Sequence, residues 1–546
     1  MSEKSMRRLL LFLFFLSGVS ALIYQVVWVR MFGDVFGVTV YAVATVVTTF
    51  MAGLALGAYL FGRWIDRAGN PLGVFALLQL GIGLFALLFP SLLGRLTQAY
   101  VALHRQFPAS FYMRSLVRFG LSFGLLILPT TLMGGTLPVL SKFFVGRLKR
   151  LGGDMGHLYA ANNLGAVIGV FAAGFFLIRT VGMHFTIGTA AAINLAVAAL
   201  AYVASVKADR SQPSPQASEE GPDDQNGDAP PVAAPTYPRH VRTLVLWAFG
   251  IEGFCALSYE VVWTRVLTGM SHHKTVYLFS TILISFIFGL SLGSFIIARF
   301  IDRTRSLLAL FGLMEIAIGV SAIAMLPVFK LLPGLLRQTY RASLEAWWSG
   351  ALENLIWFLV LLVPTTLMGT TFPIVSKIYT RTLDALGRRI GTIGCLDTIG
   401  SIFGSFVAGF VLIPFIGMAK AVAVTAVINL LIGASLVAFE PLRSGKLKLA
   451  AGVGGVVLAV GALGLTPSEL RFEHWLRERP FTHFVYYREG VSATVAVPEL
   501  PSGERGLMID GFTTAVGNYG DLRVHKMLGY LPWLLHENPK SSLVIG

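Results

Sequence analysis

Long apolar stretches alternate with short polar segments along most of the chain. A helix of about 20 apolar residues crosses the hydrocarbon core of a bilayer, so each stretch predicts one membrane-spanning helix. Two further stretches, 95–110 and 330–348, are amphipathic and too polar to span, and we expect them to lie at the membrane interface. The thirteen predicted spans are 8–31, 37–62, 72–94, 114–137, 156–180, 184–205, 242–266, 275–300, 306–327, 352–374, 391–416, 418–439 and 449–466.

The two halves of this pattern repeat each other at an offset of about 235 residues. Chance similarity between apolar helices would not preserve glycine, proline and polar positions in the same order. Each half holds six spans, so both halves enter the membrane from the same side, as a parallel repeat. The matched blocks are Gly18–Arg30 with Gly253–Arg265, Gly53–Arg67 with Gly289–Arg303, Pro129–Lys142 with Pro364–Lys377, and Gly165–Gly182 with Gly400–Gly417.

The repeat also decides how two local features are interpreted. The first span begins with basic residues, as a signal peptide does, but its near-copy lies inside the chain, where no signal peptide occurs. We therefore expect a membrane helix there. Pro129 and Pro364 each open a Pro-Thr-Thr-Leu-Met-Gly segment. Because proline frees a backbone carbonyl that must face protein or water, both segments predict helix interruptions.

A segment rich in proline and acidic residues separates the two halves and lacks apolar periodicity, which predicts a flexible linker. Lys and Arg are more frequent in the loops on the N-terminal side of the membrane, which favours a cytoplasmic N-terminus and a multi-pass protein of the cell (inner) membrane. The predicted domains are a first repeat at 1–205, the linker at 206–240, a second repeat at 241–440, an extra helix at 441–467 and a C-terminal domain at 468–546.

Composition agrees with a membrane protein, since 55% of the residues are hydrophobic and only 13% are charged. A soluble chain is nearer one quarter charged, so an ordinary soluble or disordered protein is excluded. The formal charge of +15 is assigned to loops that face the cytoplasm and anionic lipid, so we expect the bilayer as a partner and no nucleic acid. Cys255 and Cys395 lie in apolar runs and give neither a disulfide framework nor a metal-binding spacing.

Acidic residues inside the predicted spans are confined to the second repeat. A charge within a span is costly and marks a candidate functional site. We hypothesise a pocket between the halves with an acidic second-half wall, suited to a cation such as a polyamine or a proton. The alternative is that the acids pair with Arg265, Arg299 or backbone groups and only hold helices together. The predicted pocket residues are Gln25, Gln79 and Asn162 in the first repeat, and Glu252, Glu260, Glu315 and Asp397 in the second; Ser17 is the counterpart of Glu252.

The loop after the second span carries Asp66-Arg67-Ala68-Gly69, and Asp302-Arg303 repeats its start. This loop resembles the cytoplasmic Asp-Arg-x-Gly loop of the major facilitator superfamily. An acid and an arginine at a helix end can form a switchable pair, so we interpret both loops as gating loops. Together with the parallel repeats, the resemblance implies an all-α, major facilitator-like membrane part.

The C-terminal domain has the composition of a soluble protein. Val485–Val497 and Gly506–Ile509 predict strands, divided by a turn at 498–502, and a helix follows through His525 to Pro532. The strand ending in Asp510-Gly511, the Leu-Pro helix and the final Val-Ile-Gly resemble the opening part of spermidine synthases, polyamine aminopropyltransferases with an α/β domain. The whole chain is similar to the fused major facilitator/spermidine synthase-like family of integral membrane proteins.

That resemblance implies that the intact protein transfers an aminopropyl group to a polyamine, with decarboxylated S-adenosylmethionine as co-substrate. It assigns Asp510, Gly511 and Thr514 to substrate binding, with Thr514 standing where soluble synthases have glutamine. It also places Gly546 at the start of the nucleotide-loop strand. The loop glycines and the catalytic acid would lie beyond Gly546, so we expect a fragment that holds no cofactor and cannot catalyse the transfer by itself.

Two functions therefore remain open from the sequence. One is the membrane-bound synthase, and the other is a transporter of a cationic or polyamine-type solute with a non-catalytic, ligand-binding C-terminal domain. Thirteen spans and a cytoplasmic N-terminus would place the C-terminal domain outside, which disagrees with a cytoplasmic nucleotide cofactor. The altered motif around Thr514 and Asn518 favours the transporter. Catalytic residues and oligomeric state are not readable.

Overall fold

The structure is a computed structural model that describes residues 3–36, 40–106, 111–209, 237–271, 276–342, 349–441, 445–466 and 483–541. Most of the predicted linker and Gly546 lie outside these residues. Ten helical stretches of the described chain are long and apolar enough to cross a membrane. Two of these stretches each contain a sharp bend and hold two successive helices. The protein is therefore a multi-pass membrane protein, as the sequence predicts.

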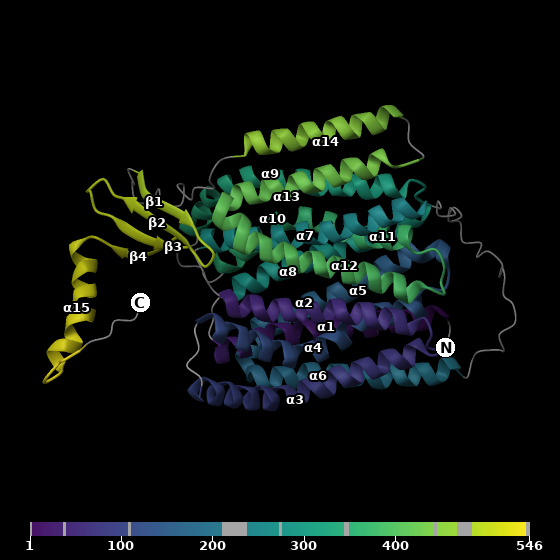
Figure 1. The fold of residues 1–546 in the computed structure, drawn as a ribbon, viewed down its shortest axis with the longest axis horizontal. Coiled ribbons are helices and arrows are strands. Elements are labelled where there is room, and N and C mark those ends of the chain that lie inside the picture. Colours follow the sequence, from purple (N-terminus) through teal and green to yellow (C-terminus); the bar gives the residue numbers. More distant parts are fainter. Residues whose placement is uncertain are drawn as a thin grey trace.

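The first repeat is a set of six long helices (Figure 1). A six-residue π-helical segment, Ala172–Leu177, joins the fifth helix to the sixth. The helices are α1 (Glu3–Phe36), α2 (Val40–Ile65), α3 (Pro71–Gln106), α4 (Phe111–Phe144), α5 (Leu151–Phe171) and α6 (Ile178–Asp209).

The second repeat has the same order of helices, except that its fourth member is divided in two. Another helix, α14 (Gly445–Leu465), packs along the last helix of the repeat. A helix is thus confirmed where the thirteenth span was predicted, and its crossing of the membrane stays a prediction. The helices are α7 (Arg239–Met270), α8 (Val276–Ala298), α9 (Leu307–Ala342), α10 (Ser349–Gly369), α11 (Thr371–Tyr379), α12 (Leu386–Val407) and α13 (Ile413–Ala438).

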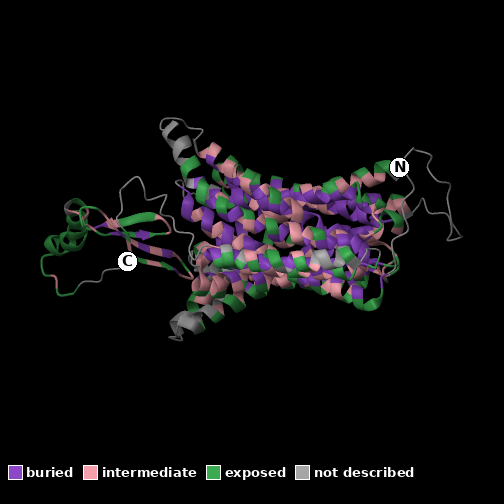
Figure 2. Cartoon of the chain, turned by 90° about the horizontal axis from the view of Figure 1, so that it is seen from above, coloured by how far each residue is buried: buried purple, intermediate pink, exposed green. Residues whose placement is uncertain are grey.

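Equivalent helices pack in equivalent pairs. In the first repeat α1 packs on α5, α2 on α4 and α3 on α6, and in the second α7 packs on α12, α8 on α10 and α9 on α13. The repeats meet where α2 packs on α12 and α5 packs on α8. Buried residues fill the spaces between the helices, and exposed ones cover the outside of the bundle (Figure 2). The internal duplication of the sequence therefore gives two repeats whose helices pack in the same pairs.

The aromatic cores of the two repeats match closely. Tyr24 and Trp28 stack at 5.2 Å between ring centroids on α1, and Tyr259 and Trp263 stack at 5.1 Å on α7. All four rings are buried. Stacked rings of this kind contribute beyond the burial of their area, so the matched block of the sequence fixes the same core twice.

Two glycines bend the chain at equivalent places. Gly182 in α6 and Gly417 in α13 have φ of +76° and +82°, which favours glycine because it lacks Cβ. Each glycine follows a π-helical segment and turns the last helix of its repeat back along the bundle. The predicted division between the fifth and sixth spans is therefore confirmed in both repeats.

The proline segments behave differently from the prediction. Pro129 lies inside a continuous α4, whereas the Pro364 segment ends at a break between α10 and α11. Thr130 and Thr131 donate to the Leu126 and Ile127 carbonyls, both at 2.6 Å, and so supply hydrogen bonds in the turn that proline disturbs. Thr365 and Thr366 make the equivalent bonds in the second segment. The predicted interruption of the first segment is wrong, because α4 continues through it.

The expected interfacial helices are also absent from the described chain as separate elements. The stretch from residue 95 continues α3 without a break to Gln106, and the stretch from residue 330 continues α9 to Ala342. Helical hydrogen bonding thus extends beyond the apolar span that the hydropathy pattern marks.

The C-terminal part forms a four-stranded antiparallel sheet in the order β1-β2-β3-β4, followed by α15 (Tyr519–Leu535). The strands are β1 (His483–Glu489), β2 (Thr494–Glu499), β3 (Gly506–Ile509) and β4 (Phe512–Val516). The single strand predicted over Val485–Val497 is wrong, because the chain turns at Gly490 and pairs β1 with β2. We call the end of the bundle beside the sheet the sheet end, and the opposite end, which holds the N-terminus, the linker end (Figure 1).

Candidate functional site

A buried neutral network connects three helices of the first repeat. Gln79 of α3 donates through Nε2 to Ser17 Oγ of α1 at 2.6 Å. Asn194 of α6 donates through Nδ2 to Gln79 Oε1 at 2.7 Å. All three side chains are buried. Both polar atoms of the Gln79 side chain thus form hydrogen bonds. The network joins α1, α3 and α6 without a charged group.

The second repeat carries an acidic version of this network. Asn429 of α13 donates through Nδ2 to Glu315 Oε2 of α9 at 2.7 Å. Tyr259 of α7 donates through its hydroxyl to Asn429 Oδ1 at 2.9 Å. Glu252 of α7, the counterpart of Ser17, is buried and lies within electrostatic range of Glu315 and Asp397. Carboxyl groups therefore occupy two of the three positions that are neutral in the first repeat.

Asp397 extends this acidic group toward the first repeat. Its Oδ1 lies 2.5 Å from where a Cβ on Gly253 would stand, so α12 and α7 touch closely at this residue. Tyr159 of α5 belongs to the first repeat and lies within electrostatic range of both Asp397 and Glu252. The counterpart Asn162 approaches Gly18 through its backbone oxygen, 2.1 Å from where a Cβ would stand, as the backbone oxygen of Asp397 approaches Gly253 at 2.4 Å.

The residues predicted to line one pocket thus fall into separate groups. Gln79 belongs to the neutral network, whereas Glu252 and Glu315 belong to the acidic one. Gln25 and Glu260 are half-buried on α1 and α7, one residue beyond the stacked tyrosines. The sequence did not predict Asn194 and Asn429 as site residues. The signal that could have found them is the repeat itself, since the two asparagines lie 235 residues apart.

The arginines that could have neutralised the acids point elsewhere. Arg265 donates to the backbone carbonyls of Gly490, at 2.6 Å, and Val491. Arg299 lies over the Phe295 ring, 4.6 Å from its centroid. Across the described ranges, no Lys, Arg or His lies at ion-pair distance from the carboxyl groups of the acidic network or from Asp397. The predicted pairing with these arginines is therefore not what holds the acids.

At the linker end, Asp66 joins the two repeats. It follows α2 of the first repeat and accepts the backbone N–H groups of Gly387 and Arg388 at the start of α12, both at 2.9 Å. Lys142 lies 3.2 Å from Asp66 Oδ1 and donates to the Leu383 carbonyl of the second repeat at 2.7 Å. A carboxylate at a helix N-terminus satisfies free N–H groups and complements the helix dipole.

Asp302 makes the same contact in the opposite direction. It follows α8 of the second repeat and accepts the N–H groups of Gly152 and Gly153 at the start of α5, at 3.2 and 2.9 Å. Lys377 donates to Asp302 Oδ1 at 2.8 Å. We call these two contacts the cross-repeat caps. The ion-pair partners found for the two aspartates are Lys142 and Lys377, the last residues of two matched blocks. They are not the adjoining arginines of the predicted gating pairs.

The C-terminal sheet docks on the second repeat at the sheet end. Glu489 of β1 accepts the backbone N–H of Met418, directly after the bend at Gly417, at 2.5 Å. Arg265 of α7 bonds to the turn between β1 and β2, as described above, and does not extend to the lipid surface as a span-end arginine would. These contacts fix the sheet to α7 and α13.

The residues assigned to substrate binding form a turn in this docked sheet. Asp510 and Gly511 have φ of +50° and +77°, as in a type I′ hairpin turn, for which Asp-Gly is a favoured sequence. Asp510 Oδ1 accepts the Thr494 N–H at 2.7 Å, and Gly511 approaches the Gly269 carbonyl of α7. Thr514 is exposed. The structure thus gives Asp510 and Gly511 a folding and docking role.

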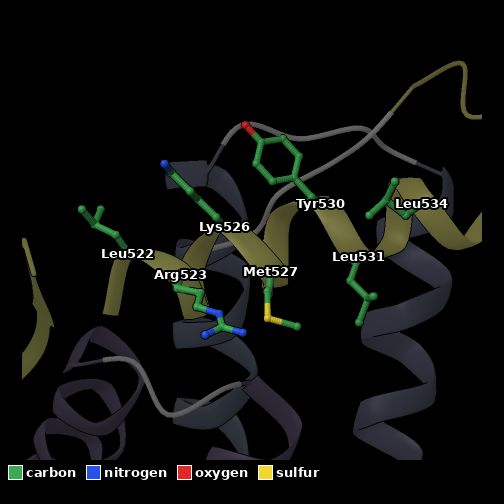
Figure 3. Close-up of a pocket in the computed structure, with 7 residues that line it drawn as sticks. All are labelled: Leu522, Arg523, Lys526, Met527, Tyr530, Leu531 and Leu534. Carbon is green, nitrogen blue, oxygen red and sulfur yellow. The ribbon is translucent and has the colours of Figure 1, made fainter. Parts of the chain in front are cut away.

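A hollow of about 410 Å³ lies on α15 (Figure 3), and none of its lining residues belongs to either polar network. Its described lining comes from one helix and includes two cations but no acid. It is therefore separate from the acidic network. The lining residues are Leu522, Arg523, Lys526, Met527, Tyr530, Leu531 and Leu534.

Comparison with known proteins identifies the membrane part. Residues 9–336 match the Major Facilitator Superfamily. A bacterial homologue of the iron transporter ferroportin in an outward-facing state superposes with a TM-score of 0.52 at 14% identity, over 79% of this chain and 98% of that one. The same homologue soaked with iron gives 0.51 at 12% identity, over 79% and 98% of the two chains. The E. coli fucose:proton symporter gives 0.49 at 14% identity, over 80% and 98%. No curated protein matches.

These matches correct the expected enzyme. Both the matched family and the matched fold are those of membrane transporters, and nothing in the matches supports a fused spermidine synthase. The expectation of a membrane-bound aminopropyltransferase is therefore wrong, and the transporter alternative fits better. Since the family match spans more than half of the chain, the protein belongs to the Major Facilitator Superfamily.

Proposed function

We propose that the protein transports a small cationic solute across the membrane by alternating access between its two repeats. Membership of the Major Facilitator Superfamily and the parallel arrangement of the repeats support a transporter. The excess of Lys and Arg in the loops of the linker end supports a cytoplasmic linker end. The docked sheet then serves as an appended, non-catalytic module.

One observation carries the choice of a cation: the acidic group formed by Glu252, Glu315 and Asp397. A buried charge is stabilised only by a partner charge or by hydrogen bonds. In the described chain Asn429 donates a hydrogen bond to Glu315, and no cationic side chain lies at ion-pair distance from the three carboxyl groups. An ammonium group or a proton would supply the missing positive charge, whereas an anion would be repelled.

The cross-repeat caps supply the other half of the mechanism. Asp66 and Asp302 each bond to the other repeat at the linker end, and in this proposal these contacts close that end. Opening it requires both carboxylates to leave the N-termini of α12 and α5. Because Lys142 and Lys377 accompany the two aspartates, each carboxylate keeps a counter-ion when its cap breaks. Such a pair of equivalent, breakable contacts suits a reversible change between two states.

Uptake of radiolabelled spermidine into proteoliposomes tests the proposal. We expect uptake by the wild-type protein, and a loss of at least tenfold in Asp397→Asn and in Glu252→Gln. The matched control is Asn162→Ala, which changes the equivalent position of the first repeat and should retain uptake. Absence of wild-type uptake would contradict a polyamine-type solute, and unchanged uptake in both acidic-site variants would contradict the acidic site.

A further inference from the structure

Glu315 has one carboxyl oxygen without a hydrogen-bond partner among the described residues, although its side chain is 0% exposed. Its other oxygen accepts from Asn429. We propose that Glu315 and Glu252 form a buried proton-binding site, in which Glu315 Oε1 carries a proton that it shares with Glu252. The site lies within the second repeat, between α7 and α9.

The first repeat supplies the template for this assignment. Gln79 accepts from Asn194 through Oε1 and donates to Ser17 through Nε2 at 2.6 Å. In the second repeat, Glu315 Oε2 accepts from Asn429 as Gln79 Oε1 does from Asn194. Glu315 Oε1 therefore stands in for the donating nitrogen of the amide. A carboxyl oxygen can donate only when it is protonated.

The hydrogen bonds decide which oxygen holds the proton. Tyr259 donates to Asn429 Oδ1 at 2.9 Å, which fixes the amide so that its nitrogen faces Glu315. Glu315 Oε2 is thus bonded to a donor and acts as an acceptor. Glu315 Oε1 remains for the proton, and Glu252, only 4% exposed, takes the place of the Ser17 hydroxyl.

The surroundings favour a single negative charge on the pair. Glu252 and Glu315 lie within electrostatic range, so two carboxylates here would repel each other, and burial strengthens that repulsion because the local dielectric is low. The described titratable or polar groups that face the pair carry no positive charge. They are Cys255 and Tyr259 on α7, Asn429 on α13, Asp397 on α12 and Tyr159 on α5.

The site also gives a route for coupling. When the shared proton leaves, a second negative charge develops beside Asp397, which lies within electrostatic range of Glu252. That added charge strengthens the attraction for a cation at Asp397, so one positive charge replaces another. This coupling rests on the proposed transport function, whereas the shared proton rests only on the hydrogen-bonded network.

Infrared difference spectroscopy of the full-length protein in lipid nanodiscs tests the proton directly. A protonated carboxyl group gives a C=O stretching band that shifts when its proton is exchanged for deuterium. We expect such a band at neutral pH in the wild type, and its loss in Glu315→Gln and in Glu252→Gln. Both variants should fold, because an amide and a neutral partner already occupy these places in the first repeat.

Glu353→Gln is the matched control, since Glu353 is also buried in the second repeat and accepts from Ser271 and Trp357. The Glu315 band should persist in this variant. A wild-type protein without a protonated carboxyl band at neutral pH, or a band unchanged in both Glu315→Gln and Glu252→Gln, would overturn the proposal. Spermidine uptake that persists without the band would overturn the proton site alone, whereas a band without uptake would overturn only the transport proposal.

Discussion

The two repeats share one packing plan but differ in charge. Ser17, Gln79 and Asn194 join three helices of the first repeat through neutral hydrogen bonds. In the second repeat Glu252 and Glu315 replace Ser17 and Gln79, while the asparagine is kept. Acidic groups therefore stand where the other repeat joins its helices through neutral groups, so the same packing accommodates both kinds of network.

The ends of the repeats give a second contrast. At the linker end the cross-repeat caps are reciprocal, because Asp66 binds the second repeat and Asp302 binds the first. At the sheet end the symmetry is lost. Glu489 contacts the bend at Gly417, whereas a Cβ on Gly182 would meet no described atom within 4 Å. The closing contacts are thus shared between the repeats, and the docked sheet acts on one of them.

The largest expected effect concerns a contact that both repeats need equally. A Cβ on Gly165 would stand 1.9 Å from the Phe15 carbonyl oxygen, and one on Gly400 would stand 1.8 Å from that of Gly250. Replacing either glycine with alanine forces the helices apart, at a cost of about 3 kcal/mol. Recovery of monodisperse protein on size-exclusion chromatography should fall in both variants and stay normal in the control Gly188→Ala. If only one of the two alanine variants lowered the recovery, the helix contacts at Gly165 and Gly400 would not be equivalent.

Smaller effects are expected at the cross-repeat caps. Asp66→Ala or Asp302→Ala removes a charged cap, worth about 1 to 2 kcal/mol, and so shifts the population toward an open linker end. The reporter is alkylation of half-buried Cys395 on α12, in a Cys255→Ser background. We expect several-fold faster labelling in each single variant and a larger increase in the double variant. Unchanged labelling would contradict a gating role for the caps.

The smallest effect is expected at the contact between the C-terminal sheet and the second repeat, which the first repeat lacks among the described residues. Glu489→Gln removes the charge bonded to the Met418 N–H, at a cost of about 1 kcal/mol. Amide hydrogen exchange at the start of α13 should become several-fold faster. The control Glu499→Gln removes the charge of a surface pair with Arg505, away from Met418, and should leave that segment unchanged. Equal exchange in all three proteins would show that the sheet is not held through Glu489.

The sequence predicted most of the membrane part, since hydropathy marks the spans and the matched blocks mark the repeat. It also identified Glu252 and Glu315 by comparison with Ser17 and Gln79. It missed Lys142 and Lys377 as partners of the caps, because the contacts join loops far apart in the chain.

The error in the strand prediction of the C-terminal part has a local cause. A continuous run of β-forming residues concealed the turn at Gly490, where β1 reverses to pair with β2. Asp510-Gly511 was interpreted through a family resemblance, although the same dipeptide is also a hairpin-turn sequence. Local pattern alone does not separate these two meanings, and the structure shows the hairpin turn and its docking against α7.

Converting the acidic network into its neutral counterpart tests the central claim most directly. The double variant Glu252→Ser/Glu315→Gln gives the second repeat the side chains that the first repeat has at both positions. We predict a thermal unfolding midpoint within a few degrees of the wild type, because the hydrogen bonds are retained, and a loss of at least tenfold in spermidine uptake by proteoliposomes. A stable double variant with wild-type uptake would contradict the account.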